Sequence, residues 1–282
     1  MAKPTTIEDV QVILTQPGNA RLAVVKVITS EPGLYGVGCA TFTQRIHAVA
    51  AAVEQHLKPF QIGRDVSRIE EIWQMSMVHG YWRNGPVLNN AISGVDQALW
   101  DIKGKQAAMP VHDLLGGKCR NAANVYVHAD GPTPQDVTDR VQHFLDEGYR
   151  FVRIQQGLYG GGRTGSPPPE DAPDGAYFDP KAYRRDTLTM IEHVRSAVGP
   201  DVELLHDVHE RLAPSDAVLF AKDVEPFRLF FLEDLLAPED LQWFERVRSQ
   251  CATPLAMGEL FNHPLEWRTV IERRLVDFIR MH

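Results

Sequence analysis

Short apolar runs alternate with helical stretches throughout the second half of the chain, and this alternation constrains the fold most strongly. The predicted strands are VYVHAD (125–130), FVRIQQ (151–156), VELLHDVH (202–209), RLFFLED (228–234), PLAMGEL (254–260) and VDFIRMH (276–282). The predicted helices lie near 134–147, 182–198, 214–222, 238–250 and 266–274. Because apolar strands joined by helices form parallel sheets, we expect an α/β fold, either an open sheet or a (β/α)₈ barrel. No glycine-rich dinucleotide fingerprint follows an early strand, which disfavours a Rossmann-like sheet.

The first part of the chain has a mixed pattern. Two strands, LAVVKVIT (22–29) and YGVGCATF (35–42), are separated by a turn, and helical stretches follow near 44–58, 67–78 and 86–107. The segment LLGGKCR at 114–120 is typical of a domain boundary. We therefore predict an N-terminal α+β domain over residues 1–118 and a barrel domain over residues 119–282.

Charge and cysteine usage limit the partners and the compartment. The chain of 282 residues has a formal net charge of −8 and no block rich in Lys or Arg, which argues against nucleic acid and anionic membranes as partners. Its three widely spaced cysteines, Cys39, Cys119 and Cys251, are typical of reduced thiols. No apolar run is long enough for a transmembrane span or a signal peptide, so we expect a cytoplasmic protein.

The connection between the second predicted strand and its helix is unusually long. Residues 157–180 are rich in Gly, Pro and Asp. A loop of this length inside a compact domain is usually a functional lid or a disordered segment, and the sequence alone leaves both open.

Three predicted strands end in a carboxylate at regular intervals. Asp207 and Glu233 are 26 residues apart, and Glu259 follows after 26 more. This interval matches one βα unit, so the three acids would meet at the C-terminal edge of the sheet, where barrel enzymes build their active sites. Clustered carboxylates repel one another unless a cation lies between them, and oxygen ligands suit Mg²⁺. The sequence therefore predicts a magnesium site.

Other polar residues accompany these strands. Arg153 and Gln155 share one face of the second strand, and strand alternation would place His209 on the same face as Asp207. His128 lies near the end of the first strand. Asp234, in contrast, is expected to be solvated or to cap a helix.

Together these residues resemble a known family. The chain resembles the enolase superfamily, specifically its mannonate dehydratase branch, in the motifs LLHDVHER, FLED and MGELFN at their spacing, preceded by AISGVDQALWDIKGK and LLGGK. This branch includes D-mannonate and D-gluconate dehydratases. It is also described as the galactonate dehydratase family or as starvation-sensing proteins. The resemblance extends from about residue 7 to the end. It implies an N-terminal α+β capping domain on a modified (β/α)₈ barrel, and a homo-oligomer, tetramer or octamer.

The resemblance also implies a reaction. Mg²⁺ would be held by Asp207, Glu233 and Glu259, the proton next to a sugar-acid carboxylate would be removed to give an enediolate, and the 3-hydroxyl would leave as a 2-keto-3-deoxy acid forms. His209 would protonate the departing hydroxyl, since histidine can carry a proton near neutral pH. His128 and Gln155 are the candidate substrate-binding residues.

The candidate base departs from the family pattern. In this branch an Arg on the second strand acts with a Tyr twelve residues later. Arg153 matches that Arg, but residue 165 is Gly, and the nearest tyrosine is Tyr159.

The sequence also ends within the sixth predicted strand. A closed barrel needs two more strands, so we expect either a fragment of a longer product or a sheet edge that something covers.

Two alternative functions fit parts of the sequence. A racemase or cycloisomerase of the same superfamily typically has a Lys-x-Lys pair on the second strand, and the corresponding RIQ has no Lys. A non-catalytic or regulatory relative would bind a small acid with low or no turnover, and the altered loop after Arg153 favours it.

Overall fold

The computed structural model describes residues 3–157, 170–171, 173 and 178–281. By contacts the chain divides into two compact units, Met1–Ala122 and Ala123–His282. Each unit has its own hydrophobic core, as expected for separate domains. None of the helices in the described ranges combines the length and apolarity that crossing a bilayer requires.

The first unit contains a three-stranded antiparallel sheet in the order β1-β2-β3. Its strands are β1 (Ile7–Thr15), β2 (Leu22–Thr29) and β3 (Tyr35–Cys39). Only β2 and β3 were predicted, and β1 was missed. In β1 the apolar alternation is interrupted, because Ile7 and Val10 are both buried and a register shift between Ile7 and Asp9 accommodates them.

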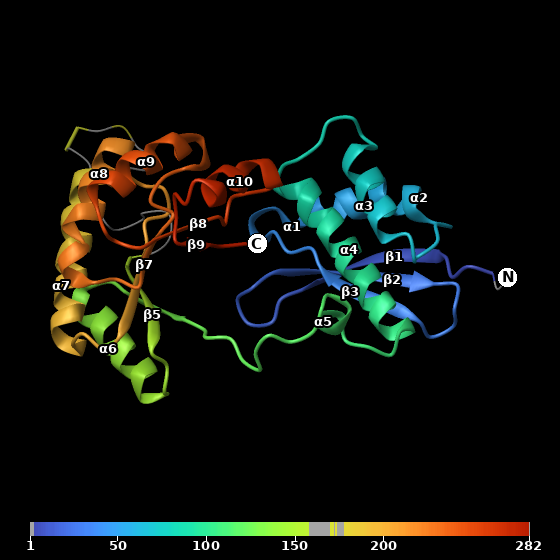
Figure 1. Cartoon of the computed structure of the whole chain (residues 1–282), viewed down its shortest axis with the longest axis horizontal. Helices are drawn as coiled ribbons and strands as arrows, with labels where there is room; N and C mark the ends of the chain where they lie inside the picture. The colour runs from blue at the N-terminus through green and yellow to red at the C-terminus, as the bar shows by residue number, and fades with distance from the viewer. Residues whose placement is uncertain (1–2, 158–169, 172, 174–177, 282) are drawn as a thin grey trace. The chain divides into compact units, whose positions relative to one another are not determined.

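The helices of this unit are η1 (Thr43–Arg45), α1 (Ile46–Ala51), η2 (Ala52–Leu57), α2 (Lys58–Gln61), α3 (Ile69–Val78), α4 (Pro86–Gln106) and α5 (Val111–Leu114). The long helix α4 lies along the sheet (Figure 1) and buries Ile92, Val95 and Leu99 at helical spacing. It begins with Pro86 in the first turn, where a missing N–H costs nothing.

Close contact between β3 and α4 depends on glycine. A Cβ atom at Gly38 would overlap the carbonyl oxygen of Gly94 and would lie 2.8 Å from the Cβ of Gln97. At Gly94 itself, a Cβ atom would lie 2.7 Å from the Cβ of Ala40. The helix backbone therefore approaches the strand backbone more closely than any larger residue permits.

The close approach of β3 and α4 can be tested by adding a methyl group at the contact. Gly38→Ala should lower the free energy of unfolding by about 1–3 kcal/mol, because an overpacked strand and helix must separate. Gly80→Ala is the matched control, since a Cβ atom there meets nothing closer than the Trp82 carbonyl oxygen at 3.8 Å. Urea unfolding of both variants measures the difference, and equal stability of the two would contradict the packing argument.

The second unit contains a six-stranded parallel sheet in chain order. Its strands are β4 (Val127–Gly131), β5 (Phe151–Gln156), β6 (Glu203–Asp207), β7 (Phe231–Glu233), β8 (Leu255–Met257) and β9 (Phe278–Ile279). All six coincide with predicted strands, although most are shorter. The prediction of parallel strands joined by helices is confirmed.

The connecting helices begin at sequence signals. They are α6 (Pro134–Asp146), α7 (Pro180–Val198), α8 (Pro214–Asp223), η3 (Glu225–Phe227), η4 (Pro238–Trp243), α9 (Phe244–Gln250) and α10 (Pro264–Glu272). Thr133 and Asp136 form a capping box at the start of α6, and the Asp179 side chain accepts N–H bonds at the start of α7. Such caps satisfy amide groups that a helix cannot pair itself.

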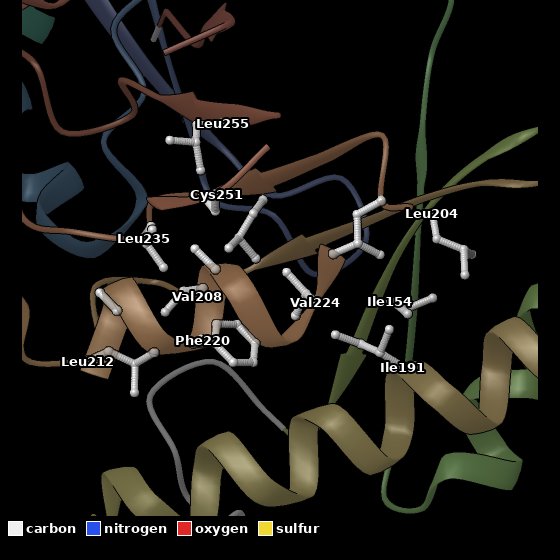
Figure 2. Close-up of a cluster of buried hydrophobic side chains, with 14 of the residues drawn as sticks. Ile154, Ile191, Leu204, Val208, Leu212, Phe220, Val224, Leu235, Cys251 and Leu255 are labelled. Carbon is white, nitrogen blue, oxygen red and sulfur yellow. The ribbon is translucent and has the colours of Figure 1, made fainter. Parts of the chain in front are cut away.

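Strand alternation assigns the two faces of this sheet. Ile154 of β5 and Leu204 of β6 point toward the helices, where they meet Ile191 of α7 and the residues around Phe220 of α8 (Figure 2). Helices α6 to α9 lie on this side of the strands (Figure 1). The alternate residues therefore point to the opposite face, which carries the charged groups described next.

Candidate active site

One face of the parallel sheet gathers polar side chains toward the C-terminal ends of its strands. The register pairs His128 with Arg153 across β4 and β5, and Asp207 with Glu233 across β6 and β7. Gln155 lies two residues beyond Arg153, on the same face. The strand order thus brings residues far apart in sequence to a single edge, as predicted.

An aromatic layer lies toward the other end of the same face. Phe230 has its ring centroid 5.0 Å from those of Phe151 and Phe278, and Phe231 lies 5.3 Å from Phe278. Tyr126 completes the layer, 6.2 Å from Phe231 in an edge-to-face arrangement. These rings give the polar groups an apolar base, which strengthens the electrostatic interactions above it.

Three acids at the strand ends form a compact cluster. Carboxylate oxygens of Glu233, Asp234 and Glu259 all lie within 4.8 Å of one another, an arrangement that could hold a metal ion. Asp207 is outside this group, although it lies at the same edge and pairs in register with Glu233. The structure therefore brings together two of the three predicted ligands, with Asp234 in place of Asp207.

The expectation for Asp234 was wrong. Its side chain is neither solvated nor a helix cap, since the residue is only 4% exposed and the next helix, η4, has Ala237 at its N-cap. Asp234 directly follows the last residue of β7 with a left-handed backbone, φ 43°. That conformation breaks strand alternation and lets two consecutive acids share one cluster.

Two arginines pair with the acids. Nη1 of Arg153 donates to Oδ2 of Asp207 at 3.3 Å, and both side chains are buried. Nη1 of Arg280 lies 2.5 Å from Oε1 of Glu233 and 2.6 Å from Oε2 of Glu259. Arg280 was missed at the sequence level; it directly follows β9, two residues after Phe278, whose ring belongs to the aromatic layer of the site face.

His209 lies beside Asp207, but for a different reason from the one predicted. Strand β6 ends at Asp207, and His209 has a left-handed backbone with φ 56°, so strand alternation does not extend to it. Instead, the Asp207 side chain accepts a hydrogen bond from the His209 amide at 2.9 Å, as in an Asx turn. This turn places Nε2 of His209 3.7 Å from Oδ2 of Asp207 and 3.9 Å from Oε1 of Glu259.

Burial and mutual repulsion disfavour ionisation of the acids. Burial raises the pKa of Asp207 to about 6, even with Arg153 beside it. Burial also raises the pKa of Asp234, to about 8, and the charges of Asp207, Glu233 and Glu259 act in the same direction. The pKa of Glu233 is raised by burial and by Asp207, against the effect of Arg280. Additional positive charge at this edge would relieve the repulsion.

The pKa values of the two site histidines are lowered, whereas those of the acids are raised. Burial lowers the pKa of His209, with Glu259 opposing the change. The pKa of His128 is lowered to about 4, first by partial desolvation and then by the charges of Arg153 and Arg280. Both rings are therefore mainly neutral near pH 7.

The remaining predicted site residues differ in their burial and in their position on the sheet. Gln155 is buried on the site face, and neither its amide oxygen nor its nitrogen has a hydrogen-bond partner among the described residues. His128 is exposed on β4, next to Arg153 in register. Tyr159 and Gly165 lie outside the described residues. Gln155 thus offers a donor and an acceptor to a ligand.

Behind the site, a neutral histidine fixes β6 to its neighbours. His206, on the helix-facing side, lies 2.9 Å from the carbonyl oxygen of Ile154 through Nδ1 and 2.9 Å from the Tyr183 hydroxyl through Nε2. Since a carbonyl can only accept, Nδ1 carries the proton and the hydroxyl donates to Nε2. These contacts tie β5, β6 and α7 together directly behind Asp207.

Comparison with known proteins identifies the family. Residues 1–116 match the N-terminal domain of mandelate racemase and muconate lactonizing enzyme, and residues 136–282 match the enolase C-terminal domain-like family. The chain belongs to the enolase superfamily. The predicted capping domain and barrel-type domain are confirmed by these matches.

Several similar proteins of the superfamily are dehydratase-family members. D-galactonate dehydratase family member RspA of Pantoea ananatis is 51% identical over 294 residues, covering 98% of this chain and 70% of that protein. A D-galactonate dehydratase family member of Enterococcus gallinarum is also 51% identical, covering 100% of this chain and 70% of its own length.

Two solved structures of related proteins superpose on this chain. The crystal structure of an enolase from Pantoea ananatis, with bound D-gluconate and Mg, superposes with a TM-score of 0.93 at 49% identity and covers 99% of this chain and 71% of that chain. A putative dehydratase from Zymomonas mobilis superposes with a TM-score of 0.83 at 28% identity and covers 98% of this chain and 73% of that chain.

In this enolase-superfamily chain, one glycine sets the spacing between β8 and β9 at the site. Gly258 has φ +143°, and a Cβ atom there would overlap the carbonyl oxygen of Arg280. It lies between the end of β8 and Glu259, while the Arg280 amide donates to the Met257 carbonyl at 2.9 Å. The glycine therefore allows Glu259 and Arg280 to face each other across neighbouring strands.

Gly258→Ala should consequently destabilise the chain by more than its backbone strain alone, by about 2–4 kcal/mol in total. Gly199→Ala is the control, because Gly199 also has a positive φ, +77°, but nothing lies within 4 Å of a Cβ atom there. The control should lose only about 1 kcal/mol. Chemical denaturation measures both, and a smaller loss for Gly258→Ala than for the control would disprove the close approach.

Proposed function

We propose that the chain catalyses the Mg²⁺-dependent dehydration of a sugar acid of the D-mannonate or D-gluconate type to a 2-keto-3-deoxy acid. The observation that carries this proposal is the carboxylate cluster of Glu233, Asp234 and Glu259 at the ends of β7 and β8, with Asp207 and His209 beside it. It is supported by the dehydratase-family relatives and by the Pantoea ananatis structure with D-gluconate and Mg.

The residues at this edge fit a magnesium ion. The donors of the Glu233, Asp234 and Glu259 cluster are carboxylate oxygens, the type that Mg²⁺ prefers. Oε2 of Glu233 is buried and has no hydrogen-bond partner among the described residues, so it is an acceptor that a cation could use. Glu233 and Glu259 would hold the ion, with Asp207 as the third ligand that the family resemblance implies and Asp234 as the competitor that proximity suggests. When bound, Mg²⁺ would supply positive charge beside the substrate carboxylate and so make the neighbouring C–H proton more acidic.

The protein's own residues would carry the proton transfers. His209 would donate a proton to the departing 3-hydroxyl from its protonated form, which its lowered pKa makes the minor form near pH 7 but a stronger acid. Arg153, buried against Asp207, and Tyr159 are the candidates for proton removal next to the carboxylate. Gln155 and His128 would bind substrate oxygens on the β4–β5 side of the site.

The candidate metal ligands can be distinguished by replacing one carboxylate at a time with its neutral amide. Glu233→Gln should weaken Mg²⁺ binding by at least about 100-fold, because it removes a ligand charge, whereas loss of a residue that only supports the ligands typically costs 10–100-fold. Asp207→Asn should weaken binding as strongly and Asp234→Asn less, if Asp207 is the third ligand. Titration calorimetry with Mg²⁺ measures all three, and the reverse order would make Asp234 the ligand.

His209→Asn tests the proposed acid. We expect kcat for sugar-acid dehydration to fall by about 10²-fold or more, with Mg²⁺ affinity nearly unchanged, because His209 is not a ligand. A structural histidine would instead lower the melting temperature and leave turnover per folded molecule the same. Melting temperature, Mg²⁺ affinity and dehydration rate are therefore measured together, and full turnover by a well-folded variant would refute the role.

A substrate panel distinguishes enzyme from binding protein. D-mannonate and D-gluconate are the first candidates, followed by other sugar acids, each assayed with Mg²⁺ for formation of a 2-keto-3-deoxy acid. Turnover of one of them supports the dehydratase. Binding of a sugar acid without turnover would favour the non-catalytic relative.

A further inference from the structure

One arginine contacts the same carboxylates that would hold the metal. Nη1 of Arg280 lies within 2.6 Å of both Glu233 and Glu259, so a single nitrogen bridges acids from two different strand ends. Glu233 is 1% exposed, and its burial as a charge requires a cation nearby. Arg280 supplies that cation from within the chain.

The Arg280 guanidinium and the proposed magnesium ion would bind the same carboxylates. Arg280 contacts Oε1 of Glu233 and Oε2 of Glu259, and the same two carboxylates belong to the proposed magnesium site. Even if the metal bound the other oxygen of each carboxylate, the guanidinium and the ion would lie close together at the same partly buried edge. Like charges at that separation repel strongly.

The backbone of Arg280 is fixed, but its side chain has room to move. The Arg280 amide donates to Met257, and Gly258 lies against the Arg280 carbonyl, so β9 holds the residue in register. The side chain itself is 36% exposed, which gives the guanidinium a path to solvent without movement of the strand. A long, flexible side chain of this kind can move its charged head toward water while its stem stays packed.

We propose that Arg280 is an internal competitor of the divalent cation: it neutralises Glu233 and Glu259 when no metal is bound and is displaced from them when the metal binds. The inference rests on the proposed magnesium site. It makes Arg280 a stabiliser of the metal-free protein and an opponent of metal affinity, two effects with opposite signs in one residue.

Arg280→Gln separates these effects. After treatment with a chelator, the Arg280→Gln variant should melt at a lower temperature than the wild type, because the buried charge of Glu233 then has no arginine partner. The same variant should bind Mg²⁺ about tenfold more tightly or better, since no cation competes. Arg280→Lys keeps the positive charge and should bind Mg²⁺ with an affinity close to that of wild type. Melting curves and calorimetric titration with Mg²⁺ alone measure both quantities without any turnover.

Arg248→Gln is the matched control. Arg248 forms an ion pair with both carboxylate oxygens of Asp277, at 2.8 and 3.0 Å, just before β9 rather than at the site. Its loss should lower stability and leave Mg²⁺ affinity unchanged. A tighter Mg²⁺ site in the control would show that the effect is not specific to Arg280.

The outcomes distinguish this inference from the proposed function. If wild type binds Mg²⁺ and a folded Arg280→Gln binds it equally or more weakly, the competition is refuted and the magnesium site stands. If only the variant binds Mg²⁺, the competition is supported in its strongest form. If neither protein binds, both proposals fail. Should the variant not fold, wild-type crystals with bound Mg²⁺ decide, because Nη1 of Arg280 still bridging both glutamates would overturn the proposal.

Discussion

Repulsion among carboxylates at the ends of three adjacent parallel strands is the constraint on which the rest of the site depends. Parallel pairing places Asp207 beside Glu233, and the next strand brings Glu259 to the same edge. Positive charge offsets part of this repulsion. Arg153 of β5 and Arg280, directly after β9, supply it from within the chain on the two sides of the acids.

The sequence was sufficient to predict the sheet and the edge, because both follow from simple periodicities. Apolar runs separated by helical stretches give parallel strands, and a spacing of one βα unit returns each acid to the same rim. The alternation within VRIQ likewise predicted that Arg153 and Gln155 share the site face. These features depend only on local pattern and chain order, which a sequence states directly. The strand β1 was missed because a register shift interrupts its alternation.

The remaining details of the site depend on backbone conformations that periodicity does not encode. His209 and Asp234 both have positive φ, immediately after strands that end earlier than their apolar runs suggest. For His209 the cause is the Asp207 side chain, which accepts the amide hydrogen bond that would otherwise continue a strand ladder. Arg280 was missed for a different reason, since its importance appears only when β9 lies beside β8.

The early strand ends are themselves part of how the site works. A side chain within a strand is held perpendicular to the sheet and can approach only its register neighbours, whereas a residue in a turn can lean across the edge. Asp207 and Glu233 are the last residues of their strands, and Asp234, His209 and Glu259 lie just beyond theirs. The rigid sheet thus fixes the first pair, while the turns bring the other three toward them. This division explains how acids from neighbouring strands come together although each strand by itself would hold them apart.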